Sequence, residues 1–248
     1  MERVKTGIVG LDELIEGGFE KGSLIEVSGG EGTFKSTFAL QFAVAGIRNN
    51  EKVTYISLEE TEESFKETAA ALGYANEFAK IDFRNIDIND VIQSMKTFVN
   101  SSAGAEELAK KILKIIDSPS RLIFDTATTL ALYSSRTGLK PVSGGKWQFI
   151  SPTPGDIRVM LYYLANELRK KKECTTLFLA ESGEGELYLP EEVLKYICDS
   201  KIELKKSTLG TTVPRTIIIH KMRHTLHPLD EMTLELSKKG LTVNKLTG

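Results

Sequence analysis

A glycine-rich stretch at residues 28–37 holds the side chains of this sequence that are best suited to chemistry. It reads SGGEGTFKST, follows the apolar run 24–27 and leads into the helix-like run 38–47. A strand, a glycine turn and a Lys-Ser pair that opens a helix are the layout of a phosphate-binding loop, in which backbone N–H groups face the anion. We expect Lys35 to reach the outer phosphates of a nucleotide and the Ser36 hydroxyl to hold Mg²⁺.

One position departs from the usual pattern G-x-x-x-x-G-K-[ST], because Phe34 stands where glycine normally precedes the lysine. Phenylalanine keeps the amide donor and costs little in a right-handed helical conformation, whereas a left-handed one would cost about 1–2 kcal/mol. The alternative interpretation is a glycine-rich turn in an ordinary α/β protein. Under the first interpretation the nucleotide-binding residues are Gly29, Gly30, Glu31, Gly32, Thr33, Phe34, Lys35, Ser36 and Thr37.

Two adjacent acids, Glu59 and Glu60, follow a run typical of a β-strand at residues 53–56. Thr61 then caps a predicted helix at residues 62–72. Adjacent residues of a strand point to opposite faces, so only one of the two carboxylates is expected to face a bound phosphate. A carboxylate there can orient and deprotonate the attacking water in ATP hydrolysis. The alternative is a pair of solvated acids at a helix start, favoured by the helix dipole.

A third acid, Asp125, closes a short apolar run at residues 121–126, after the loop and the glutamate pair in sequence order. An unpaired carboxylate is costly to bury inside a strand, but at the end of a strand it can hold Mg²⁺ or a water molecule of the ion. The predicted metal-binding residues are therefore Ser36 and Asp125.

The opening segment, TGIVGLDELIEGGFEKGSLIEVSGGEGTFKST, resembles the start of the KaiC-type ATPases, which are relatives of RecA and RadA. The run SLEE is similar to the paired glutamates of that family, and the resemblance implies that Glu59 is the catalytic base and that Glu60 assists it. It also implies that Asp125 occupies the Walker B position and that Glu181 neighbours the γ-phosphate. The resemblance runs from Thr6 to Val243 with the elements in family order.

A basic segment near the C-terminus, Lys221-Met222-Arg223, resembles the KaiC segment that reaches across a subunit boundary to the ATP of a neighbour. The resemblance implies that Lys221 and Arg223 act with Lys35 and the glutamates in catalysis, within a homo-oligomer for which a hexameric ring is favoured. A rigid guanidinium fork suits the charge that spreads over the phosphoryl oxygens. The alternative is a basic strand edge that deters aggregation.

The elements that must position these residues follow an α/β pattern, in which buried strands alternate with amphipathic helices. The later segments predict antiparallel strands at the C-terminal edge. The principal predicted strands cover residues 24–27, 53–56, 121–126, 175–180, 199–204, 216–220, 232–236 and 241–243. We expect a RecA-like P-loop NTPase fold with a mainly parallel central sheet flanked by helices, as one domain over residues 1–248.

Residues 134–156 are rich in glycine and proline and are predicted to form a long irregular connection. Helices are predicted on its N-terminal side at 89–99 and 105–116, separated by a break at 100–104. The resemblance places such loops near a ring or filament axis, where Lys146 and Trp147 could contact single-stranded DNA. A solvated surface or a subunit contact is the favoured interpretation.

Composition narrows the class of protein. The chain has 248 residues, is 41% hydrophobic and carries a formal net charge of -2, which gives no overall attraction to nucleic acid or membranes. It shows neither a basic start followed by an apolar segment nor an apolar run of about 18 residues. We therefore expect a cytoplasmic protein with no membrane partner, in which Cys174 and Cys198 pack as small apolar groups.

Together these observations predict a Mg²⁺-dependent ATP-binding protein, a slow ATPase that releases ADP and phosphate and acts as an oligomeric switch, with a protein partner left open. The first alternative is a nucleotide-binding scaffold without turnover, because of Phe34. The second is a DNA-recombination accessory protein that resembles the RadA paralogues. The phosphorylation segment of the clock protein KaiC is not recognised here, so the resemblance implies no autokinase role. The choice between ATP and GTP stays open.

Overall fold

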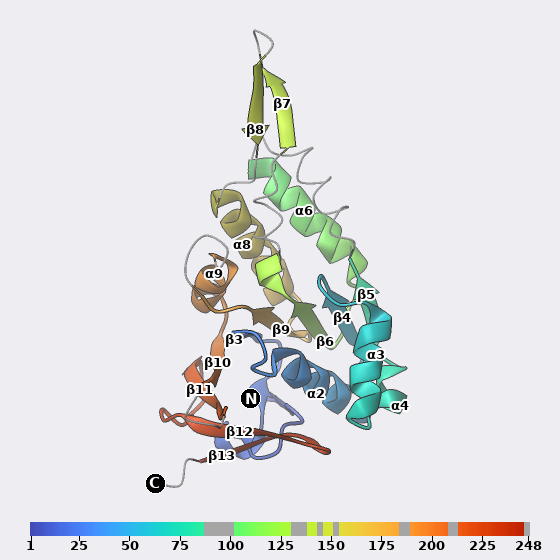
Figure 1. Cartoon of the computed structure of the whole chain (residues 1–248), viewed down its shortest axis with the longest axis vertical. Helices are drawn as coiled ribbons and strands as arrows, with labels where there is room; N and C mark the ends of the chain where they lie inside the picture. Colours follow the sequence, from blue (N-terminus) through green and yellow to red (C-terminus); the bar gives the residue numbers. More distant parts are fainter. Residues whose placement is uncertain are drawn as a thin grey trace.

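A nine-stranded sheet forms the centre of the computed structural model, which describes residues 1–86, 102–129, 138–142, 146–150, 154–183, 189–207 and 213–245. The strand order is β13-β12-β11-β10-β3-β9-β6-β4-β5, and the six strands from β10 to β5 pair in parallel. The strands β10 to β13 pair antiparallel. This confirms the predicted α/β fold, with a mainly parallel sheet and antiparallel strands at the C-terminal edge (Figure 1).

The bounds of these nine strands follow. They are β3 Leu24–Gly29, β4 Val53–Ser57, β5 Asp82–Asn85, β6 Arg121–Asp125, β9 Thr175–Ala180, β10 Ser200–Lys206, β11 Arg215–Met222, β12 Met232–Ser237 and β13 Gly240–Lys245. Two small antiparallel sheets complete the described strands, β1 Arg3–Val4 with β2 Phe19–Glu20, and β7 Gly138–Val142 with β8 Lys146–Ile150.

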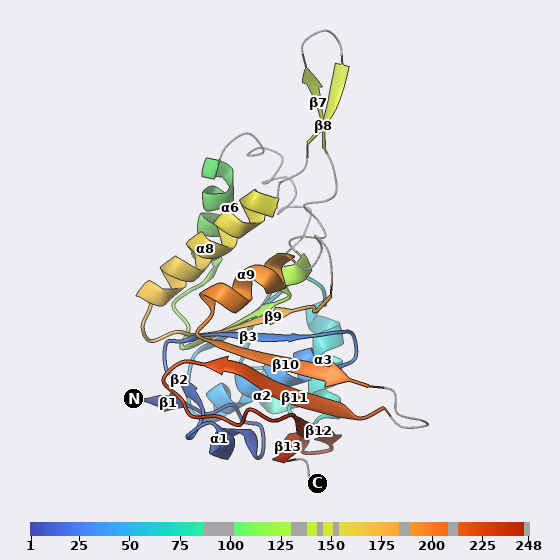
Figure 2. The same ribbon diagram turned by 90° about the vertical axis from the view of Figure 1, so that its left-hand side faces the viewer.

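Helices cover both faces of the sheet (Figures 1 and 2). On one face lie α2 Lys35–Arg48, α3 Glu62–Ala71 and α4 Ala75–Phe78, and on the other lie α6 Ser102–Ile115, α8 Pro154–Lys170 and α9 Leu189–Ile197. A short helix, α1 Leu11–Leu14, follows β1. None of the helices in the described segments is long and apolar enough to cross a membrane.

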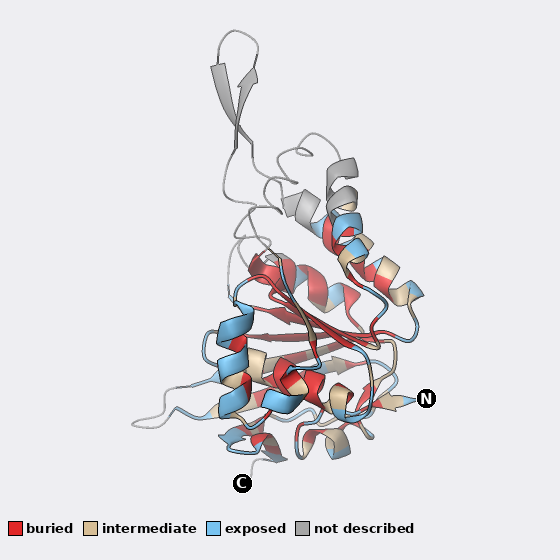
Figure 3. Ribbon diagram, turned by 90° about the vertical axis from the view of Figure 1, so that its right-hand side faces the viewer, coloured by how far each residue is buried: buried red, intermediate tan, exposed pale blue. Residues whose placement is uncertain are grey.

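Alternation of side chains along each strand divides the core into two layers. In β6, Ile123 packs into the layer beneath α2, whereas Leu122 and Phe124 pack beneath α6 and α8. The strands β3, β4, β6 and β9 are buried on both faces, as expected for parallel strands between two helix layers (Figure 3). The central strands are therefore held rigidly from both sides, and their ends are well placed to carry a site.

A fully buried arginine joins the first helix layer to the sheet. Arg121, on β6, is 0% exposed, and its Nε lies 2.5 Å from a carboxylate oxygen of Glu51. The same guanidinium donates hydrogen bonds of 2.7 Å and 2.8 Å to the carbonyls of Lys5 and Phe42. A Cβ on Gly46 would lie 2.7 Å from the Arg121 side chain, so this position of α2 has room only for glycine. One buried cation thus fastens the N-terminal segment, α2 and β6 together.

Two local predictions were wrong. The segment 134–156 is not irregular throughout, because β7 and β8 form a hairpin that projects beyond α6 and α8 (Figures 1 and 2). Helix α6 begins at Ser102, so part of the predicted break at 100–104 is helical. In both cases residues that favour turns were overridden by pairing or packing with neighbouring elements. The helix predicted at 89–99 lies outside the described residues.

Candidate phosphate-binding site

The candidate site lies at the C-terminal edge of the parallel strands. Register places Ser28 of β3 beside Ala180 of β9, and Ser57 of β4 beside Asp125 of β6. The segments that carry the predicted residues therefore all leave the sheet at one edge: the glycine-rich loop after β3, the glutamate pair after β4, Asp125 at the end of β6 and Glu181 after β9. In open α/β sheets this edge is where ligands bind.

The ammonium group of Lys35 lies over the glycine-rich loop. It donates hydrogen bonds to the carbonyls of Gly29 at 2.8 Å and Gly30 at 3.0 Å, and a carboxylate oxygen of Glu181 lies 4.0 Å away. Burial, with only 9% of the side chain exposed, lowers the pKa of Lys35, and Glu181 and Asp125 oppose that shift. Lys35 therefore has two uncharged carbonyl acceptors, which a phosphate oxygen can replace.

The loop turns through two residues with positive φ. Gly32 has φ 71° and Phe34 has φ 76° and ψ 25°, which is the left-handed helical region. Between them Thr33 donates a hydrogen bond of 2.8 Å from its Oγ1 to the carbonyl of Gly30. The open question about Phe34 is thus answered: its backbone takes the conformation that glycine normally supplies, at a cost of about 1–2 kcal/mol. Helix α2 then begins directly at Lys35.

Asp125 ends β6 in a buried position. The Tyr55 hydroxyl of β4 donates a hydrogen bond of 2.5 Å to its Oδ2. Burial raises the pKa of Asp125 to about 7, with Glu59 and Glu60 adding to the increase while the Tyr55 hydrogen bond and Lys35 reduce it. A buried carboxylate of this kind is readily ionised by a nearby cation, which is the environment expected of a metal ligand.

The two glutamates after β4 diverge. The Oε1 of Glu59 accepts hydrogen bonds from the hydroxyls of Thr126, at 2.7 Å, and Thr129, both of which follow Asp125. The carboxylate of Glu60 instead lies 3.4 Å from the Ser64 hydroxyl of α3. The strand ends at Ser57, so the two acids belong to a turn and the alternation argument does not govern them. The Glu59 carboxylate thus lies on the Asp125 side, and that of Glu60 at the start of α3.

Glu181 comes to the loop from the end of β9. Its backbone N–H donates a hydrogen bond of 2.7 Å to Thr128 Oγ1, and its carboxylate is the acid 4.0 Å from the Lys35 ammonium. The next residue, Ser182, donates from its N–H to the carbonyl of Gly29 at 3.3 Å. The segment after β9 is thereby tied to both the phosphate loop and the segment after Asp125.

Lys221 and Arg223 lie beside the N-terminal ends of the parallel strands, away from the candidate site at their C-terminal ends. Strand β11 runs antiparallel to β10, with Met222 opposite Ser200, and Ser200 pairs with Ile25 at the start of β3. Lys221 donates a hydrogen bond of 2.5 Å to the carbonyl of Cys198 at the end of α9, and Arg223 lies 3.3 Å from Asp199. The structure therefore separates both cations from the loop of their own chain.

An extra residue in β11 sets the direction of that segment. Lys201 pairs with Lys221 but the next residue, Ile202, pairs with Ile219, so His220 forms a β-bulge. After the bulge Met222 is buried, as Ile217 and Ile219 are before it.

Several residues of the site were missed from the sequence. Tyr55, Thr126 and Thr129 hold the predicted acids, and Arg215 contacts the loop from β11. Alternation within β4 places Tyr55 on one face of the sheet, but only the order of β4 beside β6 reveals its partner. Arg215 lies 183 residues from Gly32 in the chain, and no local signal could have joined them.

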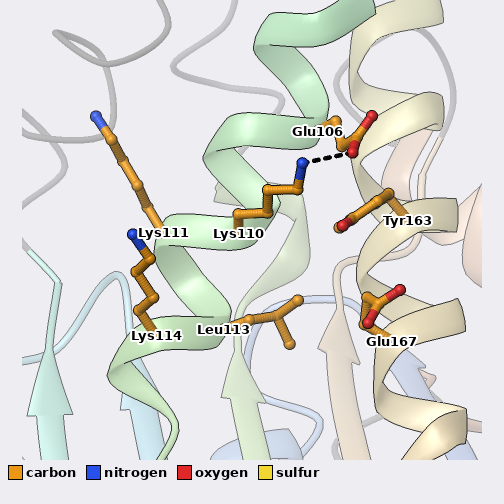
Figure 4. A pocket seen from close by; sticks show the side chains of 7 residues that line it. All are labelled: Glu106, Lys110, Lys111, Leu113, Lys114, Tyr163 and Glu167. Atoms are coloured by element: carbon orange, nitrogen blue, oxygen red, sulfur yellow. Dashed lines mark ion pairs between the residues drawn. The ribbon is translucent and has the colours of Figure 1, made fainter.

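A groove of about 640 Å³ between α6 and α8 is separate from this site, and none of the predicted site residues lines it. Figure 4 shows Lys110 of α6 reaching Glu106 on its own helix, with Tyr163 of α8 beside it. The groove is lined by Glu106, Lys110, Lys111, Leu113, Lys114, Tyr163 and Glu167.

Comparisons with known proteins identify the family of this chain. The chain is 25% identical to a UPF0273 protein of Thermotoga maritima, over 98% of this chain and 96% of the relative. It is 28% identical to a UPF0273 protein of Saccharolobus solfataricus, over 98% and 83%. The crystal structure of a KaiC-like protein from Pyrococcus horikoshii is similar with a TM-score of 0.70, at 26% identity and 98% coverage of both chains. The family model described as "ATPase: KaiC" matches residues 4–140 and 148–248. The chain therefore belongs to the KaiC family of ATPases.

Proposed function

We propose that this protein binds ATP with Mg²⁺ at the loop after β3 and hydrolyses it slowly to ADP and phosphate, as an oligomeric switch. Membership of the KaiC ATPase family supports the nucleotide-binding part of this function. The observation that carries the proposal is the meeting of Lys35, Asp125 and Glu59 at one edge of the sheet, around a loop of glycines that starts a helix.

The residues of the loop fit a triphosphate. Gly30 has open space where a Cβ would stand, so its backbone can approach a ligand closely. The N-terminus of α2 directs its free N–H groups toward the same region. On binding, the Lys35 ammonium would exchange the carbonyls of Gly29 and Gly30 for phosphate oxygens, which are stronger, charged acceptors.

The donor set also fits Mg²⁺, which prefers oxygen ligands. The Ser36 hydroxyl stands half-buried in the first turn of α2, and the Asp125 carboxylate is positioned by Tyr55. These two residues would hold the ion, which supplies charge neutralisation for the transferring phosphoryl group. Asp125 gives up its proton in this role, because a nearby cation favours the charged form of a buried carboxylate.

Glu59 is the proposed base for the attacking water. Its carboxylate is exposed to solvent yet fixed on one side by two threonine hydroxyls, so one oxygen stays available to orient water. Glu60 would assist through its charge. Lys221 and Arg223 would stabilise the transition state in the site of a neighbouring subunit, since they lie at the far edge from their own loop. We favour a hexameric ring for this homo-oligomer.

Phosphate release and nucleotide binding test the proposal directly. Wild type is expected to release phosphate from Mg-ATP, Lys35→Ala to lose binding by calorimetry, and Glu59→Gln to keep binding while turnover falls at least 100-fold. The control is Glu67→Gln, on the exposed face of α3, which should match wild type. Equal background rates for wild type and Lys35→Ala would rule out the enzyme.

A nucleotide-binding scaffold without turnover is the second candidate. Two observations favour it, namely the left-handed conformation of Phe34 and the two threonine hydroxyls that occupy Oε1 of Glu59. The same experiment distinguishes the two functions. Binding of ATP to wild type, lost in Lys35→Ala, together with no phosphate release above background would establish the scaffold.

A further inference from the structure

The phosphate loop contains a conformational cost that something outside the loop must offset. Phe34 is left-handed at φ 76°, in a position where a side chain other than glycine is strained. Its aromatic ring is half-buried and packs against the core layer beneath α2. Strained residues persist only where the surrounding structure determines them. The neighbours of this ring therefore decide whether the loop keeps its shape.

Arg215, the first residue of β11, is the residue that meets the loop. Its guanidinium carbon lies 4.2 Å from the centre of the Phe34 ring, which is stacking distance for a cation and an aromatic face. Its Nε donates a hydrogen bond of 2.8 Å to the carbonyl of Gly32. One side chain thus contacts both residues of the loop that have positive φ.

The two contacts come from a strand outside the loop, and they add to the hydrogen bond from Thr33 to Gly30 within it. Register explains the approach, because Lys206 at the end of β10 pairs with Arg215, and Leu204 pairs with Gly29 where the loop begins. Strand β11 is therefore anchored through β10 to β3, the strand that leads into the loop, where it presents Arg215. A rigid strand is a more exact support than a loop would be.

We propose that Arg215 is a positioning residue of the nucleotide site, which holds the phosphate loop in its binding conformation by stacking on Phe34 and bonding to Gly32. The pair Phe34–Arg215 takes the place of the glycine that normally precedes the lysine. The proposal rests on the proposed nucleotide binding. It assigns Arg215 no contact with the nucleotide, so its effect is on affinity and not on the chemical step.

Charge alone would give Arg215 a different role. A cation near the loop attracts a triphosphate whatever its shape, and a lysine would do so equally well. Stacking and the hydrogen bond from Nε both depend on the planar guanidinium, which lysine lacks. The variant Arg215→Lys therefore separates the two roles. A second separation comes from Phe34, because glycine tolerates positive φ and needs no stacking partner.

A double-mutant cycle on Phe34 and Arg215 provides the test, with affinity for the non-hydrolysable analogue AMP-PNP and Mg²⁺ measured by calorimetry. In the wild-type background Arg215→Ala and Arg215→Lys are both expected to weaken binding about 5-fold. In the F34G background the same changes should alter affinity less than 2-fold. Steady-state kinetics should show KM rising in Arg215→Ala while kcat stays unchanged.

Four results would overturn the proposal. The first is equal loss of affinity with and without F34G, because the two residues would then act independently. The second is wild-type affinity in Arg215→Lys, which would make charge the cause. The third is tighter binding in Arg215→Ala, which would make the contact inhibitory. A fall in kcat at constant KM would likewise remove the positioning role.

Hydrogen exchange separates this proposal from the proposed function. Loss of Arg215 should speed exchange of the amides in residues 29–37 in the absence of nucleotide, and F34G should suppress that increase. If wild type binds no nucleotide but the exchange pattern holds, the proposed function fails and the loop support stands. If nucleotide binds and exchange is unaffected by Arg215→Ala, the loop support fails and the proposed function stands.

Discussion

Glu26, in the middle of β3, is a buried acid with an unusual environment. Its side chain is 0% exposed, and neither carboxylate oxygen accepts a hydrogen bond from the described residues. Lys201 lies 3.7 Å away but also pairs with Glu191 of α9. Burial raises the pKa of Glu26 to about 8; the charged groups that face it are Lys201 from β10, Glu191 and Lys195 from α9, and Lys221 from β11.

The raised pKa predicts how stability changes with pH. Between about 4.5, the ordinary pKa, and about 8, folded Glu26 holds a proton that the unfolded chain has released. The stability from this group is therefore complete below 4.5, and falls by at most about 1.4 kcal/mol per pH unit up to 8. In urea unfolding at several pH values, Glu26→Gln should gain stability relative to wild type from pH 5 to 8. A constant difference would contradict this, and Glu67→Gln controls for net charge.

Among individual residues, the sequence predicts those whose role follows from a short motif or from their place at the end of a strand. The lysine of the loop and the acids at strand ends follow from motif and order, and the structure brings Lys35, Asp125 and Glu59 to one edge. The partners Tyr55 and Arg215 could not be predicted, because their contacts depend on which strands are neighbours. The conformation of Phe34 depends on packing in the same way.

Among the elements, α2 and β6 depend on the buried Arg121 described above. Arg121→Met keeps the length of the side chain but removes the hydrogen bonds to Glu51, Lys5 and Phe42. We expect a loss of about 3–5 kcal/mol in the free energy of unfolding, because buried acceptors are left without a donor. Urea unfolding provides the measurement.

A second arginine offers a matched control. Arg48, at the end of α2, pairs with Glu77 at 2.8 Å but its side chain is 58% exposed, so Arg48→Met should cost less than about 1 kcal/mol. Similar losses in the two variants would show that Arg121 does not fasten these elements.

The bounds of helices and strands with a regular spacing of apolar residues were predicted closely, because that spacing can be seen directly in the sequence. Strand β9 has the predicted bounds, and Thr61 caps α3 by accepting a hydrogen bond from the Ser64 amide, as expected. The hairpin of β7 and β8 was missed because Gly138 and Pro141 disfavour strands, and pairing overrides that preference. The conformational preferences of single residues do not indicate which segments will pair as strands.

For the whole molecule, the separation of Lys221 and Arg223 from their own loop predicts a site completed by a second copy. Lys35→Ala and Arg223→Ala should each be inactive alone, whereas a mixture should regain turnover, because some interfaces would join an intact loop to an intact Arg223. Phosphate release across mixing ratios measures this. Turnover that never exceeds that of either variant, in particles that sedimentation shows to be mixed, would remove the shared site.

The order of strands is the part of the whole fold that the sequence does not predict. Composition and alternation indicate an α/β protein with a buried parallel sheet, but they do not place β9 between β3 and β6. That placement brings Glu181 to Lys35.

Because of the bulge at His220, the spacing of two residues along β11 does not tell whether their side chains lie on the same face. Arg215 and Lys221 are six positions apart, and uninterrupted alternation would turn them toward the same side. The additional residue reverses the parity, so Arg215 meets Phe34 next to the α2 layer while Lys221 reaches the end of α9 on the other side. A single strand can therefore contact the phosphate loop of its own chain through Arg215 on one face and carry Lys221 on the other face. Without the bulge, alternation continued from Ile217 and Ile219 would place Lys221 on the buried face and Met222 in solvent.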